Sequence, residues 1–159
     1  MNSQKNKRKK SNPTNPKDVI CGPTESWVYS EIVRDHFFHP RNLLLDDTGY
    51  EADGEGEVGS MFCGDVMKVW IKVNPNTKRI SECKWRTFGC ASAIASTSMM
   101  SIMATENGGL TLTEATRIKP EQIIERLGGL PDRKFHCSVL GQEALRAAVE
   151  NYIKSQKTK

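Results

Sequence analysis

The chain of 159 residues lacks any long hydrophobic run. None approaches the roughly 20 consecutive apolar residues that a membrane-spanning helix needs. The N-terminus also lacks the apolar stretch of a secretory signal, and only 7% of the residues are aromatic. We therefore expect a soluble protein with no membrane partner, placed in the prokaryotic cytosol, with an organelle matrix as the alternative.

Acidic residues are missing from the first 17 positions, although six basic residues lie there. The remaining 17 basic and 19 acidic residues leave the body of the chain slightly acidic, which gives it no electrostatic reason to bind nucleic acid. The composition predicts a disordered basic tail over 1–25, one folded domain over 26–155 and a polar C-terminal tail over 156–159. A weak localisation or anionic-surface signal is the alternative role for the basic tail.

Two segments in the middle of the chain alternate between apolar and polar residues. Residues 66–73 place Met67, Val69, Ile71 and Val73 on one face, and 80–88 return with Cys83 and Trp85 opposite charged residues. This period of two, with Asn74-Pro75-Asn76 between the segments, predicts an antiparallel hairpin. The glycine-rich segment 44–60 predicts a loop followed by a short extended piece.

Helical spacing of apolar residues appears on both sides of the hairpin. It predicts a first helix that Ser26 caps and Pro40 ends, and a second helix after Cys90 that ends near Asn107. Further helices are expected at 112–116, 121–127 and 137–152. The fold class is therefore α+β: a small antiparallel three-stranded sheet with helices packed on one face.

Five cysteines, at 21, 63, 83, 90 and 137, lack the dense, even pattern of a secreted disulfide scaffold. In a reducing compartment such thiols are core residues, nucleophiles or metal ligands. Cys83 lies in mid-strand on the apolar face and is expected in the core, and Cys21 in the tail receives no role.

The other three cysteines lie at chain turns. Cys63 begins Cys63-Gly64-Asp65 before a strand, Cys90 follows Gly89 at a strand-to-helix junction, and Cys137 follows His136 at the start of the last helix. A helix N-terminus favours the thiolate form of a cysteine. Three thiolates with Asp65 and His136 would suit zinc or an iron-sulfur cluster, whereas three buried, inert thiols are the alternative.

The segments around these cysteines carry a specific combination of motifs in order along the chain. They are Tyr29-Ser30-Glu31, His39-Pro40-Arg41-Asn42, Gly56-Glu57-Val58-Gly59, Cys63-Gly64-Asp65, Thr87-Phe88-Gly89-Cys90, Ser92-Ala93-Ile94-Ala95-Ser96 and His136-Cys137-Ser138. Over about residues 27–152 this combination resembles the IscU/NifU iron-sulfur cluster assembly scaffolds. The segment 130–145 is most similar to the N-terminal domain of NifU-type scaffolds, so we expect a single-domain form of that family.

Two positions depart from the family pattern. Ala91 replaces the second glycine of the usual Gly-Cys-Gly, and 130–134 reads Leu-Pro-Asp-Arg-Lys rather than the Leu-Pro-Pro-Val-Lys that IscU shows to its dedicated heat-shock chaperone. The second departure puts a heat-shock chaperone pair in doubt as a partner. His136 separates the chain from the related SufU group, which generally lacks a histidine there.

The resemblance implies a scaffold and not a turnover enzyme. Cys63, Cys90 and Cys137 would build a transient [2Fe-2S] cluster from iron and from persulfide sulfur that a cysteine desulfurase delivers, and would pass it to apo iron-sulfur acceptor proteins. Asp65 would be an exchangeable ligand, and His136 is a candidate fourth ligand. Cys137 is the predicted first persulfide acceptor, with Cys90 as its rival, and zinc is expected in the purified, cluster-free form.

Two rival functions remain open from the sequence. The same residues could hold zinc in a regulatory module, or in a sulfur-acceptor module of the SufU type. A cysteine hydrolase using Cys137 is disfavoured, because the adjacent His136 would point about 100° away on a helix and neither His36 nor His39 has an oriented partner. A structural zinc site has no reason to accept persulfide, so sulfur chemistry separates the first rival from a scaffold.

Overall fold

The computed structural model describes residues 19–20, 26–27, 29–59, 61 and 64–157. Its main sheet has three antiparallel strands in the order β3 (Gly54–Gly59), β4 (Val66–Val73) and β5 (Ile80–Phe88). The bounds of β4 and β5 are those that the alternation predicts. β3 is the short extended piece expected before Ser60, and its Gly56 pairs with Val69 of β4.

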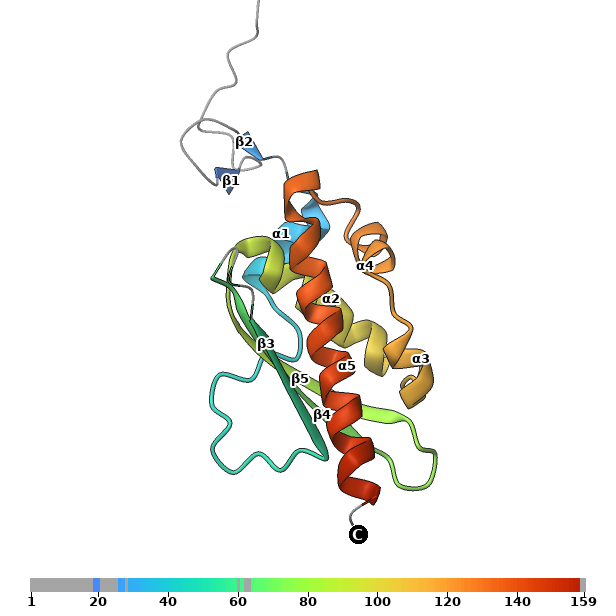
Figure 1. Ribbon diagram of the computed structural model, residues 1–159. Helices are drawn as coiled ribbons and strands as arrows, with labels where there is room; N and C mark the ends of the chain where they lie inside the picture. The colour runs from blue at the N-terminus through green and yellow to red at the C-terminus, as the bar shows by residue number, and fades with distance from the viewer. Residues whose placement is uncertain (1–18, 21–25, 28, 60, 62–63, 158–159) are drawn as a thin grey trace, which may run out of the picture.

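Helices cover one face of this sheet, as the sequence predicts (Figure 1). The helices are α1 (Glu31–Phe38), α2 (Ala91–Thr105), α3 (Leu112–Thr116), α4 (Pro120–Arg126) and α5 (Phe135–Lys157), with short 3-10 turns η1 (Glu106–Gly108) and η2 (Asp132–Lys134). α2 and α5 pack against each other and against the sheet, and α5 runs along its whole length. The predicted α+β class is confirmed.

The core lies between the sheet and these two helices. Met67, Val69 and Ile71 on β4 are completely buried, and Trp85 on β5 is buried beside them. Their partners on the helices include Ala93, Met100, Ala144 and Leu145. The predicted apolar face of the hairpin is therefore the core face, and Cys83, 1% exposed, belongs to it as expected.

The opposite face of the sheet differs from the expected wet face at Trp70. This side chain is only 2% exposed, because Lys68 and Arg86 on the neighbouring positions lie over its ring. An ammonium or guanidinium over an indole face is attracted to its π electrons. The alternation identifies the face correctly, but it does not reveal that the long cationic side chains shield the indole from water.

The first helix begins later than the sequence predicts. Ser30, not Ser26, is the N-cap: its hydroxyl accepts the Val33 N–H and donates to the Leu127 carbonyl of the α4 end. Ser26 instead belongs to a two-residue strand, β2 (Ser26–Trp27), which pairs with β1 (Val19–Ile20). Ser30 rather than Ser26 caps the helix because its hydroxyl satisfies two backbone groups at once.

Two glycines let β3 and α5 approach each other closely. A Cβ built on Gly56 would lie 2.3 Å from the Ala144 carbonyl oxygen and 2.4 Å from the Ala148 nitrogen. A Cβ on Gly54 would lie 2.4 Å from the Ala148 oxygen. The glycines of this strand therefore serve close helix packing.

The last helix extends beyond its predicted end near residue 152. α5 continues to Lys157, so residues 156 and 157 of the expected polar tail are helical. Most of the expected basic tail, residues 1–18 and 21–25, lies outside the described residues. Among the helices that the structure describes, none has the length and hydropathy to cross a membrane.

Candidate metal centre

Cys90 lies where the last sheet strand passes into α2. β5 ends at Phe88, Gly89 makes the connection, and Cys90 is the N-cap residue of the helix, with an extended backbone at φ −76° and ψ 172°. Cys90 is half-buried, and its neighbour Phe88 is 73% exposed. The thiol is thus held at a helix start, as the sequence predicts, and lies close to an exposed aromatic side chain.

The start of α5 brings a second thiol to the first. Cys137 is the third residue of α5 and is completely buried, and its Sγ lies 3.5 Å from the Sγ of Cys90. The two residues are 47 positions apart in the chain, so this contact depends on the packing of α2 against α5. Both are free thiols.

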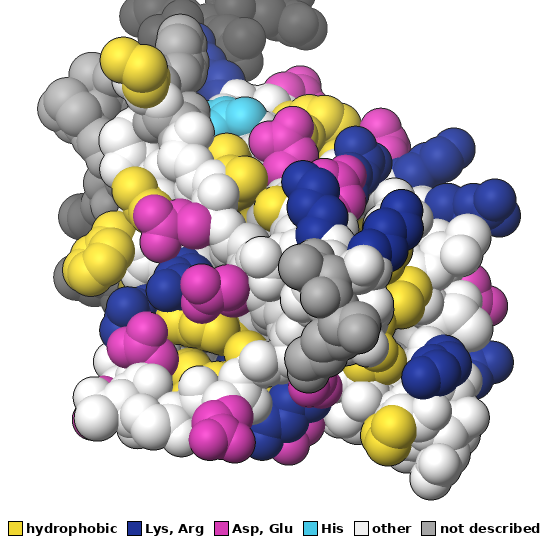
Figure 2. All heavy atoms as spheres, turned by 60° about the horizontal axis from the view of Figure 1, so that its bottom comes forward, with side chains coloured by type: hydrophobic (Ala, Val, Ile, Leu, Met, Phe, Trp, Pro, Cys, Tyr) yellow, Lys and Arg dark blue, Asp and Glu magenta, His cyan; other side chains and the backbone are white. Residues whose placement is uncertain are grey.

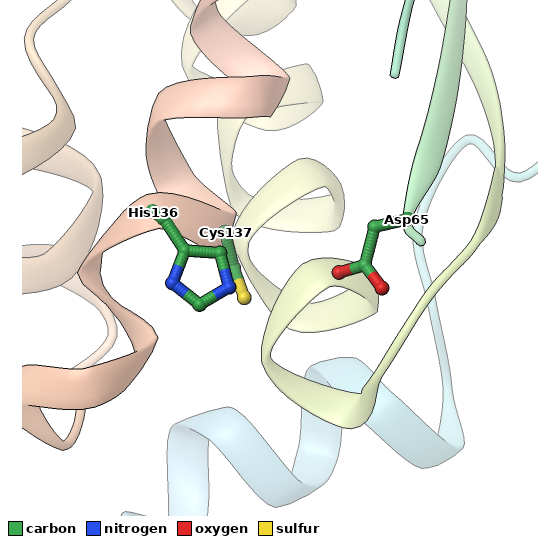
Figure 3. A group of neighbouring side chains, drawn as sticks. All are labelled: Asp65, His136 and Cys137. Atoms are coloured by element: carbon green, nitrogen blue, oxygen red, sulfur yellow. The ribbon is translucent and has the colours of Figure 1, made fainter. Parts of the chain in front are cut away.

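Asp65 faces His136 and Cys137 from the start of the middle strand (Figure 3). It lies directly before β4 and is 7% exposed. The ligand atoms of Asp65, His136 and Cys137 all lie within 4.8 Å of one another. Adjacent residues on a helix diverge, yet at this first turn the ring of His136 and the thiol of Cys137 both reach the same space. Oxygen, nitrogen and sulfur donors therefore converge from two parts of the chain, the residue before β4 and the first turn of α5.

One carboxylate oxygen of Asp65, Oδ2, is buried without a hydrogen bond from any described residue. A buried carboxylate oxygen without a partner is costly unless a cation or a proton satisfies it. Gly89 permits this position, because a Cβ there would lie 3.1 Å from Asp65 Cγ and 3.2 Å from Oδ2.

The two thiols have opposite acidities. The hydrogen bond from Cys137 lowers the pKa of Cys90 to about 5, against burial, which opposes the charge. The same bond, together with burial, raises the pKa of Cys137 above that of an ordinary thiol. The two thiols therefore titrate as a coupled pair, in which the charge on one thiolate disfavours a second. That each helix start favours a thiolate stays a prediction.

Lys134 is a site residue to which sequence reasoning assigned no role. Burial opposes its charge, but the Cys90 and Cys137 side chains outweigh this and raise the pKa of Lys134, which hydrogen-bonds Cys90. The sequence could have indicated this role, because Lys134 lies two residues before His136 and three before Cys137. Its ammonium supplies a positive charge that helps lower the pKa of Cys90.

The remaining candidates have different outcomes. Cys63 lies outside the described residues, so its role as a ligand stays a prediction. Cys21, which received no role, also lies outside them. Burial raises the pKa of Cys83 to about 12, which fits an inert core thiol. His36, for which the sequence shows no oriented partner, is buried, and its Nδ1 lies 2.8 Å from Ser98 Oγ.

Comparison with known proteins places this arrangement in a family. The model of the NifU-like N terminal domain matches residues 28–159. The chain is 47% identical over 128 residues to "Iron-sulfur cluster assembly scaffold protein IscU 1" of Archaeoglobus fulgidus, covering 80% of this chain and 78% of the relative. It is 44% identical over 129 residues to "Nitrogen fixation protein NifU" of Trichormus azollae, covering 79% of this chain but only 42% of that longer relative.

A solved structure shows the same fold. The N-terminal part of a NifU-like protein from Brucella abortus aligns with a TM-score of 0.58 at 17% identity, covering 79% of this chain and 94% of that one. Both the sheet with helices on one face and the family model therefore agree with the resemblance seen in the motifs. The chain belongs to the NifU-like N terminal domain family.

Proposed function

We propose that this chain is a scaffold on which iron-sulfur clusters are assembled and from which they are passed to acceptor proteins. The observation that carries the proposal is the convergence of Asp65, His136 and Cys137 within 4.8 Å, with Cys90 Sγ 3.5 Å from Cys137 Sγ. Relatives named as scaffold proteins match the chain over most of its length. The cluster is the cargo of this site.

The donor set suits a cargo that must leave. Thiolates bind iron strongly, whereas a carboxylate is a harder and more easily exchanged ligand for an iron-sulfur cluster. Oδ2 of Asp65, which has no hydrogen-bond partner among the described residues, is available to iron. Cys90 and Cys137, with Cys63 as the third predicted thiolate, would hold the [2Fe-2S] cluster, and Asp65 or His136 would complete its coordination.

The further parts of the proposal follow from the family. Sulfur would come as persulfide from a cysteine desulfurase, zinc would occupy the purified cluster-free form, and the chain would not turn over a substrate of its own. Acceptors would be apo iron-sulfur proteins, and the location would be cytoplasmic.

The altered segment 130–134 keeps a dedicated heat-shock chaperone pair in doubt as a partner. The face of the molecule shown in Figure 2 carries Lys and Arg as well as Asp and Glu side chains. That nucleic acid is not a partner stays an expectation from the sequence.

Cluster transfer tests this function against the zinc-module alternative, which the same Asp, His and Cys donors would also permit. The chain loaded with a cluster is mixed anaerobically with an apo-ferredoxin, and the two proteins are separated and their visible spectra recorded. We expect the absorption to move to the ferredoxin. A chain that holds zinc throughout and transfers no cluster would identify the site as structural or regulatory.

A further inference from the structure

The contact between Cys90 and Cys137 has chemical consequences of its own. Their sulfur atoms lie 3.5 Å apart with no residue between them, and closing this gap to the roughly 2.05 Å of a disulfide requires only a small movement. Cys90 is half-buried and reachable from outside, whereas Cys137 is completely buried behind it. An accessible thiol in contact with a buried one is the arrangement of an attacked and a resolving cysteine.

Resting on the proposed function, we propose that Cys137 releases sulfide from a persulfide on Cys90 by forming a Cys90–Cys137 disulfide. This assigns the persulfide to Cys90, the rival of Cys137 as first acceptor, and makes Cys137 the thiol that resolves it. Delivered sulfur is at the oxidation level of elemental sulfur, whereas a cluster contains sulfide, so two electrons are needed for each sulfur atom. A second thiol in contact with the persulfide can supply them without a separate reductant. The site would thus reduce the first sulfur atom it receives to sulfide.

The step balances in atoms and electrons. The thiol of Cys137 attacks Sγ of Cys90, the Sγ–Sγ bond forms, and the bond from Sγ to the terminal sulfur breaks. The terminal sulfur takes that electron pair and the proton of Cys137 and leaves as hydrosulfide. The two cysteine sulfurs are each oxidised by one electron and the terminal sulfur is reduced by two. A dithiol reductant must then open the disulfide before a second round.

The geometry favours release of sulfide over transfer of the persulfide to Cys137. Which sulfur of a persulfide is attacked decides the product. The atom that Cys137 touches is Sγ of Cys90, the inner sulfur of the persulfide. The terminal sulfur would extend in another direction from Cys90, because Cys137 Sγ already lies against Sγ of Cys90. Attack on the inner sulfur gives the disulfide and free hydrosulfide.

The test is a single sulfur delivery to the full, metal-free chain without any added reductant. A cysteine desulfurase is first loaded with persulfide, excess cysteine is removed, and the chain is added anaerobically. Intact mass and peptide mapping follow the added sulfur atom and the disulfide, and a colorimetric assay follows sulfide. The variants are Cys137→Ser and Cys90→Ser, with Cys83→Ser as the matched control, because Cys83 is a buried core thiol outside the site.

We expect the parent and Cys83→Ser to release sulfide in proportion to the sulfur delivered and to gain a Cys90–Cys137 disulfide. Cys137→Ser should keep the added sulfur on Cys90 and release at least about tenfold less sulfide, and Cys90→Ser should form no disulfide. A parent that keeps its persulfide, moves it to Cys137 or releases sulfide without the disulfide would overturn the inference. If no variant takes up sulfur or releases sulfide, the proposed function itself fails.

Discussion

At the scale of single residues, Asp65 sets how firmly the site would hold its cargo. Its carboxylate is buried and one of its oxygens lacks a partner in the described part of the chain. Because a carboxylate exchanges more readily than a thiolate, Asp65→Ala should retain a cluster longer than the parent. We expect several-fold slower loss of visible absorption when a chelator or an apo-ferredoxin is added.

The control for this prediction is Glu143→Ala, which removes an exposed carboxylate from α5. It should lose the cluster at the parental rate. Equal rates for Asp65→Ala and the parent would show that the carboxylate does not govern release.

Gly89 provides a second test of the same carboxylate without removing it. An added Cβ would lie 3.0 Å from Ala93 Cβ and 3.1 Å from Asp65 Cγ, so Gly89→Ala should shift the carboxylate by a few tenths of an ångström and also slow cluster loss. Gly59→Ala is the matched control, because its Cβ would meet nothing nearer than 3.8 Å. When Asp65 is already replaced by alanine, Gly89→Ala should not change the rate of cluster loss any further. An equal effect with and without the Asp65 carboxylate would show that Gly89→Ala does not act through that carboxylate.

At the scale of elements, the junction between β3 and α5 depends on glycine. A Cβ on Gly56 would overlap backbone atoms of α5 at 2.3 and 2.4 Å, and backbone cannot move aside as a flexible side chain can. Overpacking of a close-packed interior typically costs about 1–3 kcal/mol of unfolding free energy, and a clash with backbone should lie at the upper end of that range. We expect Gly56→Ala to lower the urea midpoint strongly.

Gly59→Ala on the same strand again serves as control, with no contact under 3.8 Å. Its unfolding free energy should stay within about 1 kcal/mol of the parent. A Gly56→Ala protein as stable as the control would mean that α5 lies further from β3 than described.

The elements also show how far sequence reasoning reaches. The period of two in 66–73 and 80–88 predicted both strands to the residue, because each places apolar side chains on one buried face. The predicted start of α1 was wrong, because only the tertiary contact of Ser30 with Leu127 decides whether Ser26 or Ser30 caps the helix. For the site, the cysteines, Asp65 and His136 could be named from motifs. The proximity of the thiols and the part of Lys134 depend on how α2, α5 and η2 pack, which no local pattern contains.

At the scale of the whole molecule, a buried histidine couples stability to pH. Burial lowers the pKa of His36, with Arg41 and Arg126 adding to the effect and Asp35 opposing it. Ser98 Oγ accepts the Arg41 N–H, so its own proton is free to be donated to a neutral His36 Nδ1. In the unfolded chain His36 titrates near pH 6.5. As the pH falls, the unfolded chain therefore takes up this proton at a higher pH than the folded chain does.

His36 therefore contributes full stability above about pH 6.5, and this contribution is lost as the pH falls below it. Urea unfolding of the metal-free chain between pH 8 and pH 5 checks this direction. His36→Gln should flatten the dependence, whereas His39→Gln, with a largely exposed side chain, should leave it unchanged. A parental slope in His36→Gln would assign the pH dependence to other groups.

The most direct test of the account asks whether the converging thiols build the cluster. The full chain is reconstituted anaerobically with ferrous iron, cysteine and a cysteine desulfurase, and visible absorption is recorded for the parent and for serine variants of Cys63, Cys90 and Cys137. Cys83→Ser is the control, since this thiol lies in the core. We predict a cluster in the parent and the control and its loss in the three site variants. A cluster that forms equally well without Cys90 or Cys137 would contradict the account.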